Sequence, residues 1–205
     1  EKIIKAFDVS LILYAEHSFN VSTFTARTIT SSLSDIHSAI TGAIGSLKGP
    51  LHGGANEEVM HMMGKIKKPE NALKWINKAL DNKDVVMGFG HRVYKKGDSR
   101  VPTMEKYFRK VSSIKKDKKF IKIYDIVKNV MIDKKNIHPN VDYPTGPTYH
   151  LMGFDTDFFT PIFVISRITG WSAHIMEQYA ANKLIRPLSK YSGARHRKVM
   201  PLNHR

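Results

Sequence analysis

Apolar residues recur at helical spacing through most of this chain, and almost no segment alternates between apolar and polar residues as a half-buried strand does. The helical pattern is interrupted by short stretches rich in glycine, proline and asparagine, which are typical of turns. The sequence therefore predicts an all-α fold in which loops between helices present the functional groups. The segments expected to be helical are 2–15, 57–66, 69–80, 101–111, 120–132 and 158–183.

Residues that favour helix starts refine this prediction. Asn20 or Ser22 is expected to cap one helix, and Ser34 is expected to cap another that runs through Ile36 to Ile44. Pro102 suits a first helical turn. In the last long helix the expected core residues are Ile162, Ile165, Trp171, Ile175 and Tyr179. The chain from Arg186 onward lacks periodicity and is expected to run over the surface.

A chain of 205 residues is long enough to bury a substantial core. It contains no cysteine, which rules out disulfides and thiolate chemistry and is compatible with a reducing cytoplasm. Its longest apolar stretch, 158–168, is too short and too polar to cross a bilayer, and no signal peptide is visible. We therefore expect a cytoplasmic protein without a membrane partner.

The formal net charge of +15 is concentrated in two regions. Residues 95–135 hold fourteen Lys and Arg against five Asp and Glu, and residues 183–205 hold seven Lys and Arg and no acid. A solvated basic surface explains such a distribution, and so does a partner that carries phosphate, either a cofactor or a nucleic acid. Against a nucleic acid, aromatic residues are not interleaved with the basic runs as stacking platforms would be.

Three loops carry ionisable groups beside turn residues: His52, His91 and Asp142. In the stretch 88–100, two glycines allow a close backbone approach to a ligand, His91 can polarise a carbonyl, and Arg100 can hold a carboxylate. This combination indicates a site for a small oxo-acid with an anionic co-substrate. The chain lacks a dinucleotide fingerprint, a phosphate-binding Walker loop, a nucleophile elbow and a His-Glu-x-x-His zinc motif.

Taken together, the loops resemble the three catalytic loops of the citrate synthase family: Leu-His-Gly-Gly-Ala-Asn at 51–56, Gly-Phe-Gly-His-Arg-Val-Tyr at 88–94 with Arg100, and Asn-Val-Asp at 140–142. The stretches 15–20 and 186–187 are similar to two further family motifs. The match covers essentially the whole chain and resembles the C-terminal portion of the family's longer chains. It implies a large helical domain (1–53 and 155–205, with its N-terminal helices lacking) and an inserted small helical domain (54–154).

The resemblance also implies an acyltransferase that condenses an acyl-CoA with oxaloacetate and hydrolyses the thioester. By this resemblance Asp142 is the general base, His52 donates a hydrogen bond to the thioester oxygen, and His91 polarises the ketone of oxaloacetate. The expected ligands of the oxaloacetate carboxylates are His17, Arg100 and Arg167, since arginine pairs well with carboxylates. No metal and no cofactor beyond the CoA thioester substrate is implied.

Two further implied roles involve basic residues. Lys95 aligns with a cationic position that binds CoA phosphate, and Arg186 is similar to an arginine that reaches the neighbouring site in a homodimer.

The segments 143–146, 153–155 and 160–171, and the tail from Arg186, look closer to 2-methylcitrate synthases, which use propionyl-CoA, than to citrate synthases, which use acetyl-CoA. One methylene is worth only about 1–3 kcal/mol in a pocket, so use of both thioesters is expected, with propionyl-CoA favoured. Citrate synthase of the tricarboxylic acid cycle is the alternative. The rival classes are a basic nucleic-acid-binding module and a non-catalytic interaction protein.

Overall fold

The computed structural model describes residues 1–94 and 96–205, and within them all regular structure is helical. The one pairing of extended backbone in the described residues is an isolated antiparallel bridge between Phe89 and Pro139. The predicted all-α fold is thus confirmed. The helices are α1 (Lys2–Tyr14), α2 (Val21–Ser31), α3 (Ile36–Leu47), α4 (Ala55–Ile66), α5 (Pro69–Asp81), α6 (Val101–Ile114), α7 (Lys119–Lys135), α8 (Asp142–Met152) and α9 (Phe159–Ala180), with short 3-10 turns η1 (Thr156–Phe158) and η2 (Leu202–His204).

The caps of α2 and α3 test two of the sequence predictions. Asn20 caps α2, and its side chain accepts a hydrogen bond from the amide of Thr23. The prediction that Ser34 caps the next helix is wrong, because Asp35 occupies that position and accepts from the amide of Ser38 at 3.0 Å. A carboxylate at this position satisfies an otherwise unpaired amide and also meets the positive end of the helix dipole.

The last long helix is shorter than predicted. α9 begins at Phe159, after η1, and ends at Ala180, so the chain around Lys183 is not helical. Ile162, Trp171 and Ile175 are buried as expected. Ile165 and Tyr179 are 65% and 39% exposed, so their placement in the core was wrong. The hydroxyl of Tyr179 donates to the backbone carbonyl of Ser34, so this side chain lies at the edge of the packed helices.

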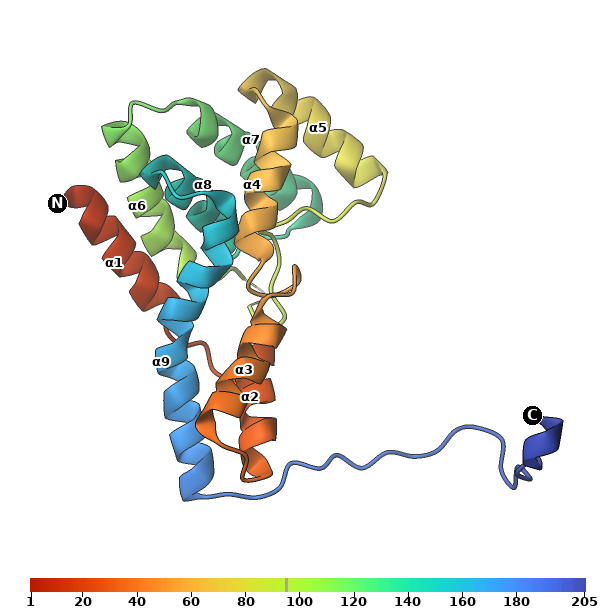
Figure 1. Cartoon of the computed structure of the whole chain (residues 1–205). Helices are drawn as coiled ribbons and strands as arrows, with labels where there is room; N and C mark the ends of the chain where they lie inside the picture. Colours follow the sequence, from red (N-terminus) through yellow and green to blue (C-terminus); the bar gives the residue numbers. More distant parts are fainter. Residues whose placement is uncertain (95) are drawn as a thin grey trace.

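The buried side chains form two clusters. One is built mainly by α4 to α8 and contains Phe108, Tyr124 and Tyr143. The other is built mainly by α1, α2, α3 and α9 around Leu47 and Trp171. Figure 1 shows α9 passing from the upper group of helices to the lower group, and it contributes buried residues to both clusters. The domain boundaries at 53/54 and 154/155 stay a prediction.

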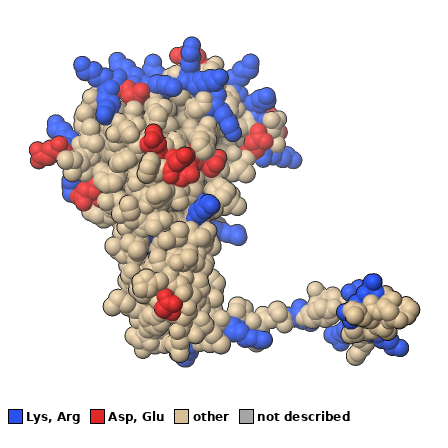
Figure 2. Space-filling view, in the orientation of Figure 1, with Lys and Arg blue, Asp and Glu red and all other residues tan. Residues whose placement is uncertain are grey.

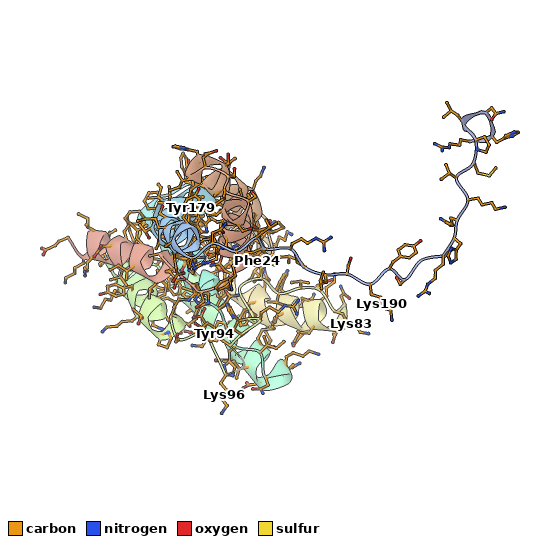
Figure 3. The ribbon with its side chains drawn as sticks, turned by 90° about the horizontal axis from the view of Figure 1, so that it is seen from below. Phe24, Lys83, Tyr94, Lys96, Tyr179 and Lys190 are labelled. Atoms are coloured by element: carbon orange, nitrogen blue, oxygen red, sulfur yellow. The ribbon has the colours of Figure 1, made fainter. Side chains whose placement is uncertain are left out.

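The C-terminal tail leaves the helical body. After the end of α9 the chain extends away from the helices and ends in η2, far from the N-terminus (Figure 1). Figure 3 shows Lys190 on this extended segment, well away from the labelled Tyr94. The tail was expected to run over the surface of the helical body. Instead it extends away from that body, and all of its residues beyond Arg186 are exposed.

Lysine and arginine side chains gather over the end of the molecule that carries α5 and α7, whereas the part formed by α2, α3 and α9 shows few charges on the face drawn in Figure 2. None of the helices in the described ranges combines the length and the apolar character that a membrane crossing requires.

Candidate active site

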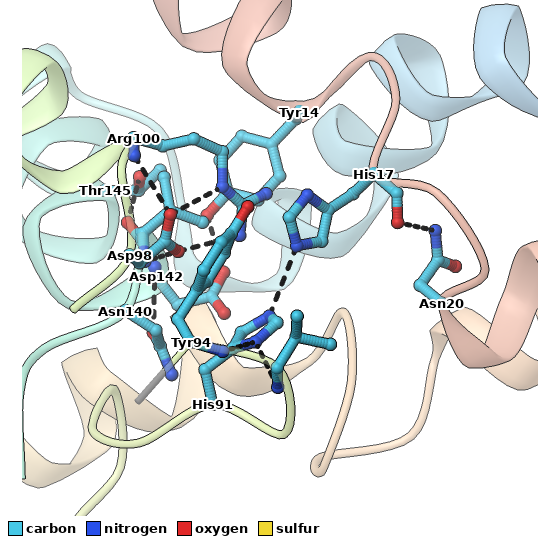
Figure 4. Close-up of polar contacts among 12 residues, drawn as sticks. Tyr14, His17, Asn20, His91, Tyr94, Asp98, Arg100, Asn140, Asp142 and Thr145 are labelled. Atoms are coloured by element: carbon cyan, nitrogen blue, oxygen red, sulfur yellow. Dashed lines mark hydrogen bonds and ion pairs between the residues drawn. The ribbon is translucent and has the colours of Figure 1, made fainter. Parts of the chain in front are cut away.

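A cavity of about 630 Å³ lies where the two groups of helices meet. Its wall is formed by the end of α1, the loops before α2 and α4, the loop 85–94, the start of α8 and the middle of α9. Six of the predicted site residues line it: His17, His52, His91, Arg100, Asp142 and Arg167. Figure 4 shows His17, His91, Arg100 and Asp142 converging on one region from separate elements.

Two predicted site residues are not part of this group. Arg186 is exposed on the extended tail and does not line the cavity of its own chain. Lys95 lies outside the described residues.

His52 is held by the first turn of α2. The backbone amide of Ser22 donates to its Nε2 atom at 3.4 Å, and the Ser22 hydroxyl lies 2.8 Å from the same atom. Trp171 fixes that hydroxyl by donating to it at 3.1 Å. Because a backbone amide can only donate, we assign Nε2 as the acceptor and place the ring proton on Nδ1. This assignment requires the Ser22 hydroxyl to donate to Nε2 and not to Oδ1 of Asn20, which lies 2.7 Å away.

Burial keeps the His52 ring neutral. It lowers the pKa of His52 to about 4, and the nearby positive charge of Arg167 adds to the effect. At neutral pH His52 is therefore an uncharged imidazole with one N–H to donate.

His91 has the opposite tautomer. Its Nδ1 atom accepts from the amides of Val93 at 3.1 Å and Tyr94 at 3.3 Å, so Nε2 carries the proton. That Nε2 lies 3.3 Å from Nε2 of His17. Burial is the main cause that lowers the pKa of both rings, to about 4 for His17. The turn after Gly90 thus aims a neutral N–H donor at the cavity.

Asp142 is the first residue of α8 and faces the cavity. Burial raises the pKa of its carboxyl to about 6, although the hydrogen bond from Tyr14 and the positive charge of Arg100 both act to lower it. A carboxylate with a pKa near 6 is a stronger base than an ordinary aspartate and remains ionised at neutral pH.

Two arginines bring positive charge to the same cavity. Arg100 forms two hydrogen bonds to Asp98, from Nε at 3.0 Å and from Nη2 at 2.8 Å, and among the described residues nothing accepts from its Nη1. Arg167 is 1% exposed, and its Nη1 atom has no hydrogen-bond partner among the described residues. Since a buried, unpaired guanidinium N–H is costly, Arg167 is suited to receive an anionic ligand.

Three residues of the site were missed as functional groups. Tyr14 was given no role beyond its place in the predicted helix 2–15, although its hydroxyl contacts Asp142, and Ser22, which contacts His52, was read only as a possible cap. Asp98 stands two residues before Arg100 and also accepts from the amide of Val141 at 3.0 Å, so it joins two of the loops. An acid this close to a predicted ligand arginine was a usable signal for Asp98, but nothing local marked Tyr14.

Among the described residues, no group of three or more His, Asp and Glu side chains is arranged to hold a metal ion.

Comparison with known proteins places this site in a family. The family description "Citrate synthase, C-terminal domain" matches residues 1–188. The chain is 61% identical to 2-methylcitrate synthase 2 of Corynebacterium glutamicum over 98% of its length and 53% of that relative, and 56% identical to citrate synthase of Mycolicibacterium smegmatis over 97% and 53%. It also superposes on citrate synthase of Thermoplasma acidophilum with a TM-score of 0.92 at 39% identity, covering all of this chain and 56% of that one.

This chain therefore belongs to the citrate synthase family. It spans about half the length of the curated relatives that it matches.

Proposed function

We propose that this chain provides the reaction site of an acyltransferase that joins a short acyl-CoA to oxaloacetate and then hydrolyses the thioester, releasing CoA. The observation that carries the proposal is the convergence of a raised-pKa carboxylate, two neutral histidines with opposite tautomers and two arginines on one cavity. The superposed T. acidophilum structure is named as a ternary complex with carboxymethyl coenzyme A and oxaloacetate, which supports both substrates.

Asp142 acts as the general base in this proposal. It removes a proton from the carbon next to the thioester carbonyl, and the negative charge moves to the thioester oxygen. His52 donates a hydrogen bond from Nδ1 to that oxygen and so stabilises the enolate as it forms. A neutral imidazole is suited to this task because it can donate without surrendering its proton.

Oxaloacetate, the second substrate, is bound and activated by other residues that line the same cavity. His91 donates from Nε2 to the ketone oxygen of oxaloacetate and makes the ketone carbon more electrophilic. Arg167 and Arg100, each with an unpaired Nη1 among the described residues, bind the two carboxylates together with His17. The enolate carbon then attacks the ketone carbon and forms the new carbon–carbon bond, while the electron pair of the ketone C=O moves to its oxygen, which takes up a proton and becomes a hydroxyl. Water then adds to the thioester carbonyl, the C–S bond breaks, and CoA leaves as the free thiol.

A thiol-release assay tests this reaction. The native-length protein, oxaloacetate and an acyl-CoA are expected to release free CoA, and Asp142→Ala is expected to lower kcat by about 100-fold or more, the usual contribution of a general base. Full activity of Asp142→Ala would remove Asp142 from its proposed role. Salt-sensitive binding of nucleic acid without any thiol release would instead favour a basic binding module.

For the acyl group we propose propionyl-CoA as the preferred substrate and acetyl-CoA as a second one. Relatives named 2-methylcitrate synthase at 61% and 57% identity support this choice, and a relative named citrate synthase at 56% supports the alternative. The ratio of kcat/KM for the two thioesters decides the question. A strong preference for acetyl-CoA would identify a citrate synthase and refute our choice.

The proposal extends to assembly. We expect a homodimer in which Arg186 of the partner subunit completes each site, and exposed apolar side chains on α2, α3 and α9, among them Phe24 and Met176, offer a surface for such contact. Lys95 is proposed to bind a CoA phosphate.

We further propose a cytoplasmic enzyme in propionate catabolism that requires no metal or redox cofactor, because side chains alone supply every step above. Cell fractionation and an assay after chelation test these two points.

A further inference from the structure

Tyr14, the last residue of α1, contacts the carboxylate that is proposed to act as the general base. Its hydroxyl donates a hydrogen bond of 2.5 Å to Oδ1 of Asp142, 128 residues later in the chain. The two residues approach because the C-terminal end of α1 meets the N-terminal end of α8 (Figure 4). Tyr14 is only 1% exposed, so this is a buried side-chain contact and not a surface one.

The ring of Tyr14 has little freedom to move. It packs edge-on against Phe163 of α9 with the ring centres 4.1 Å apart. Its backbone carbonyl accepts a hydrogen bond of 2.5 Å from Nε of Arg167. The residue is therefore fixed on both sides, by an aromatic contact and by the arginine proposed to bind oxaloacetate.

Tyr14 is also a constant donor. Burial, together with the negative charge of Asp142, raises its pKa well above 10, so the hydroxyl keeps its proton throughout the physiological range. An ionised carboxylate can only accept, and the direction of this hydrogen bond is therefore fixed.

We propose that Tyr14 is a positioning residue that occupies Oδ1 of Asp142 and leaves Oδ2 as the oxygen that takes the proton from the acyl-CoA. Among the described residues no donor contacts Oδ2, while Asp142 itself borders the cavity. The hydrogen bond also fixes the plane of the carboxylate, which a general base requires because the proton must be transferred along a defined direction. This inference rests on the proposed function, since it assigns geometry to the same base.

The charged groups around Asp142 set the direction of the expected pH effect. Besides Tyr14 from α1, they are Asp98 and Arg100 from the segment before α6, and Arg167 from α9. Of these, the Tyr14 hydrogen bond and the two arginines lower the pKa of Asp142, and Asp98 raises it. Removal of the Tyr14 hydroxyl therefore moves the pKa of Asp142 upward from about 6.

The test compares Tyr14→Phe with Tyr149→Phe. Tyr149 is a matched control because it too is 1% exposed and its hydroxyl is hydrogen-bonded, to Ser10 at 2.9 Å, outside the cavity. Both variants keep the aromatic ring, and Tyr14→Phe keeps the backbone contact with Arg167. The measurements are kcat and kcat/KM against pH, and the kinetic isotope effect with deuterium on the reacting carbon of the acyl-CoA.

For Tyr14→Phe we expect kcat to fall about 10- to 100-fold, as for loss of a hydrogen bond to a charged group, with less change in the KM for oxaloacetate. The acid limb of the pH profile should move to higher pH, and the isotope effect should grow because proton abstraction has become slower. Tyr149→Phe should show neither shift. Equal pH profiles and isotope effects in the two variants would overturn the positioning role.

A second measurement separates this inference from the proposed function. If the unaltered protein releases no CoA with either thioester, the proposed function fails. Titration of the Asp142 carboxyl by carbon NMR still tests the contact: an upward pKa shift in Tyr14→Phe supports it, and an unchanged pKa overturns it.

Discussion

Burial shifts the pKa values of the aspartate and of the histidines in the cavity in opposite directions. Removing charge from water favours the neutral form, which raises the pKa of Asp142 to about 6 and lowers the pKa of His17 and His52 to about 4. One physical cause thus produces a base of useful strength beside neutral hydrogen-bond donors. The two arginines remain charged and prevent the pKa of Asp142 from rising further.

The raised pKa of Asp142 carries a stability cost with a defined pH dependence. Between its ordinary value of 3.8 and about 6, the folded protein binds more protons at this site than the unfolded chain, so stability falls as pH rises through this window. Asp142→Asn should therefore be more stable than the unaltered protein at pH 7.5, by roughly 1–3 kcal/mol, and should lose this advantage near pH 4. Denaturant unfolding of both proteins at the two pH values measures the difference; an advantage that is equal at both would contradict it.

Removal of one partner of the ion pair between Asp98 and Arg100 should be strongly destabilising, because the Asp98 side chain is 1% exposed and that of Arg100 is 13% exposed, so the remaining charge stays largely buried. Asp98→Ala leaves the guanidinium and the amide of Val141 without their acceptor. We expect a loss of about 3–5 kcal/mol in the free energy of unfolding. Asp8→Ala, which breaks an exposed pair with Lys5, is the control and should leave unfolding nearly unchanged.

At the scale of elements, the crossing of α1 and α9 positions Tyr14 and His17. Gly170 makes it possible, since a Cβ atom at this position would lie 2.4 Å from the carbonyl oxygen of Ala15 and 3.2 Å from Cα of Glu16. Because these are backbone atoms, Gly170→Ala must push the helices apart. We expect a loss of about 1–3 kcal/mol in the free energy of unfolding, and reduced activity.

The matched control for this prediction is Gly64→Ala in α4. Nothing lies within 4 Å of the added methyl group there, and the position is exposed. This change should stabilise the protein by about 0.5–1 kcal/mol through the higher helix propensity of alanine. If both substitutions shift the unfolding midpoint in the same direction, the close approach at Gly170 is not the cause.

At this scale, features that depend on a few neighbouring residues could be predicted from the sequence, whereas contacts between distant segments could not. Most of the helices and the loops that hold His52 and His91 were predictable because periodicity, glycine, proline and polar caps act within a few residues. Helix α8 was not predicted, and Asp142, expected in a loop, is its first residue. The contact between Tyr14 and Asp142 was not, because it depends on how two helix ends meet across the chain. The exposure of Ile165 was likewise undecidable, since an apolar residue on a helix does not reveal which face its neighbours cover.

For the whole molecule, the cavity gathers residues from position 14 to position 167, but the tail that follows stays outside it. Beyond Arg186 the hydrogen bonds of the tail are internal, as from Tyr191 to the carbonyl of Ala194. Such a segment gains little by folding against its own chain. It is free to contact a second copy, and its seven Lys and Arg residues between 183 and 205 favour an acidic or carboxylate-bearing target.

This arrangement permits a direct test of whether Arg186 acts across a dimer. Arg186→Ala and Asp142→Ala should each be nearly inactive alone. In a mixture of the two, refolded together in equal amounts, a heterodimer regains one intact site, which combines Asp142 of one subunit with Arg186 of the partner subunit. Random pairing makes half of the dimers mixed, so we expect about a quarter of the unaltered activity. If Arg186 serves the site of its own chain, every site in the mixture lacks one residue, and thiol release should stay at the level of the separate variants.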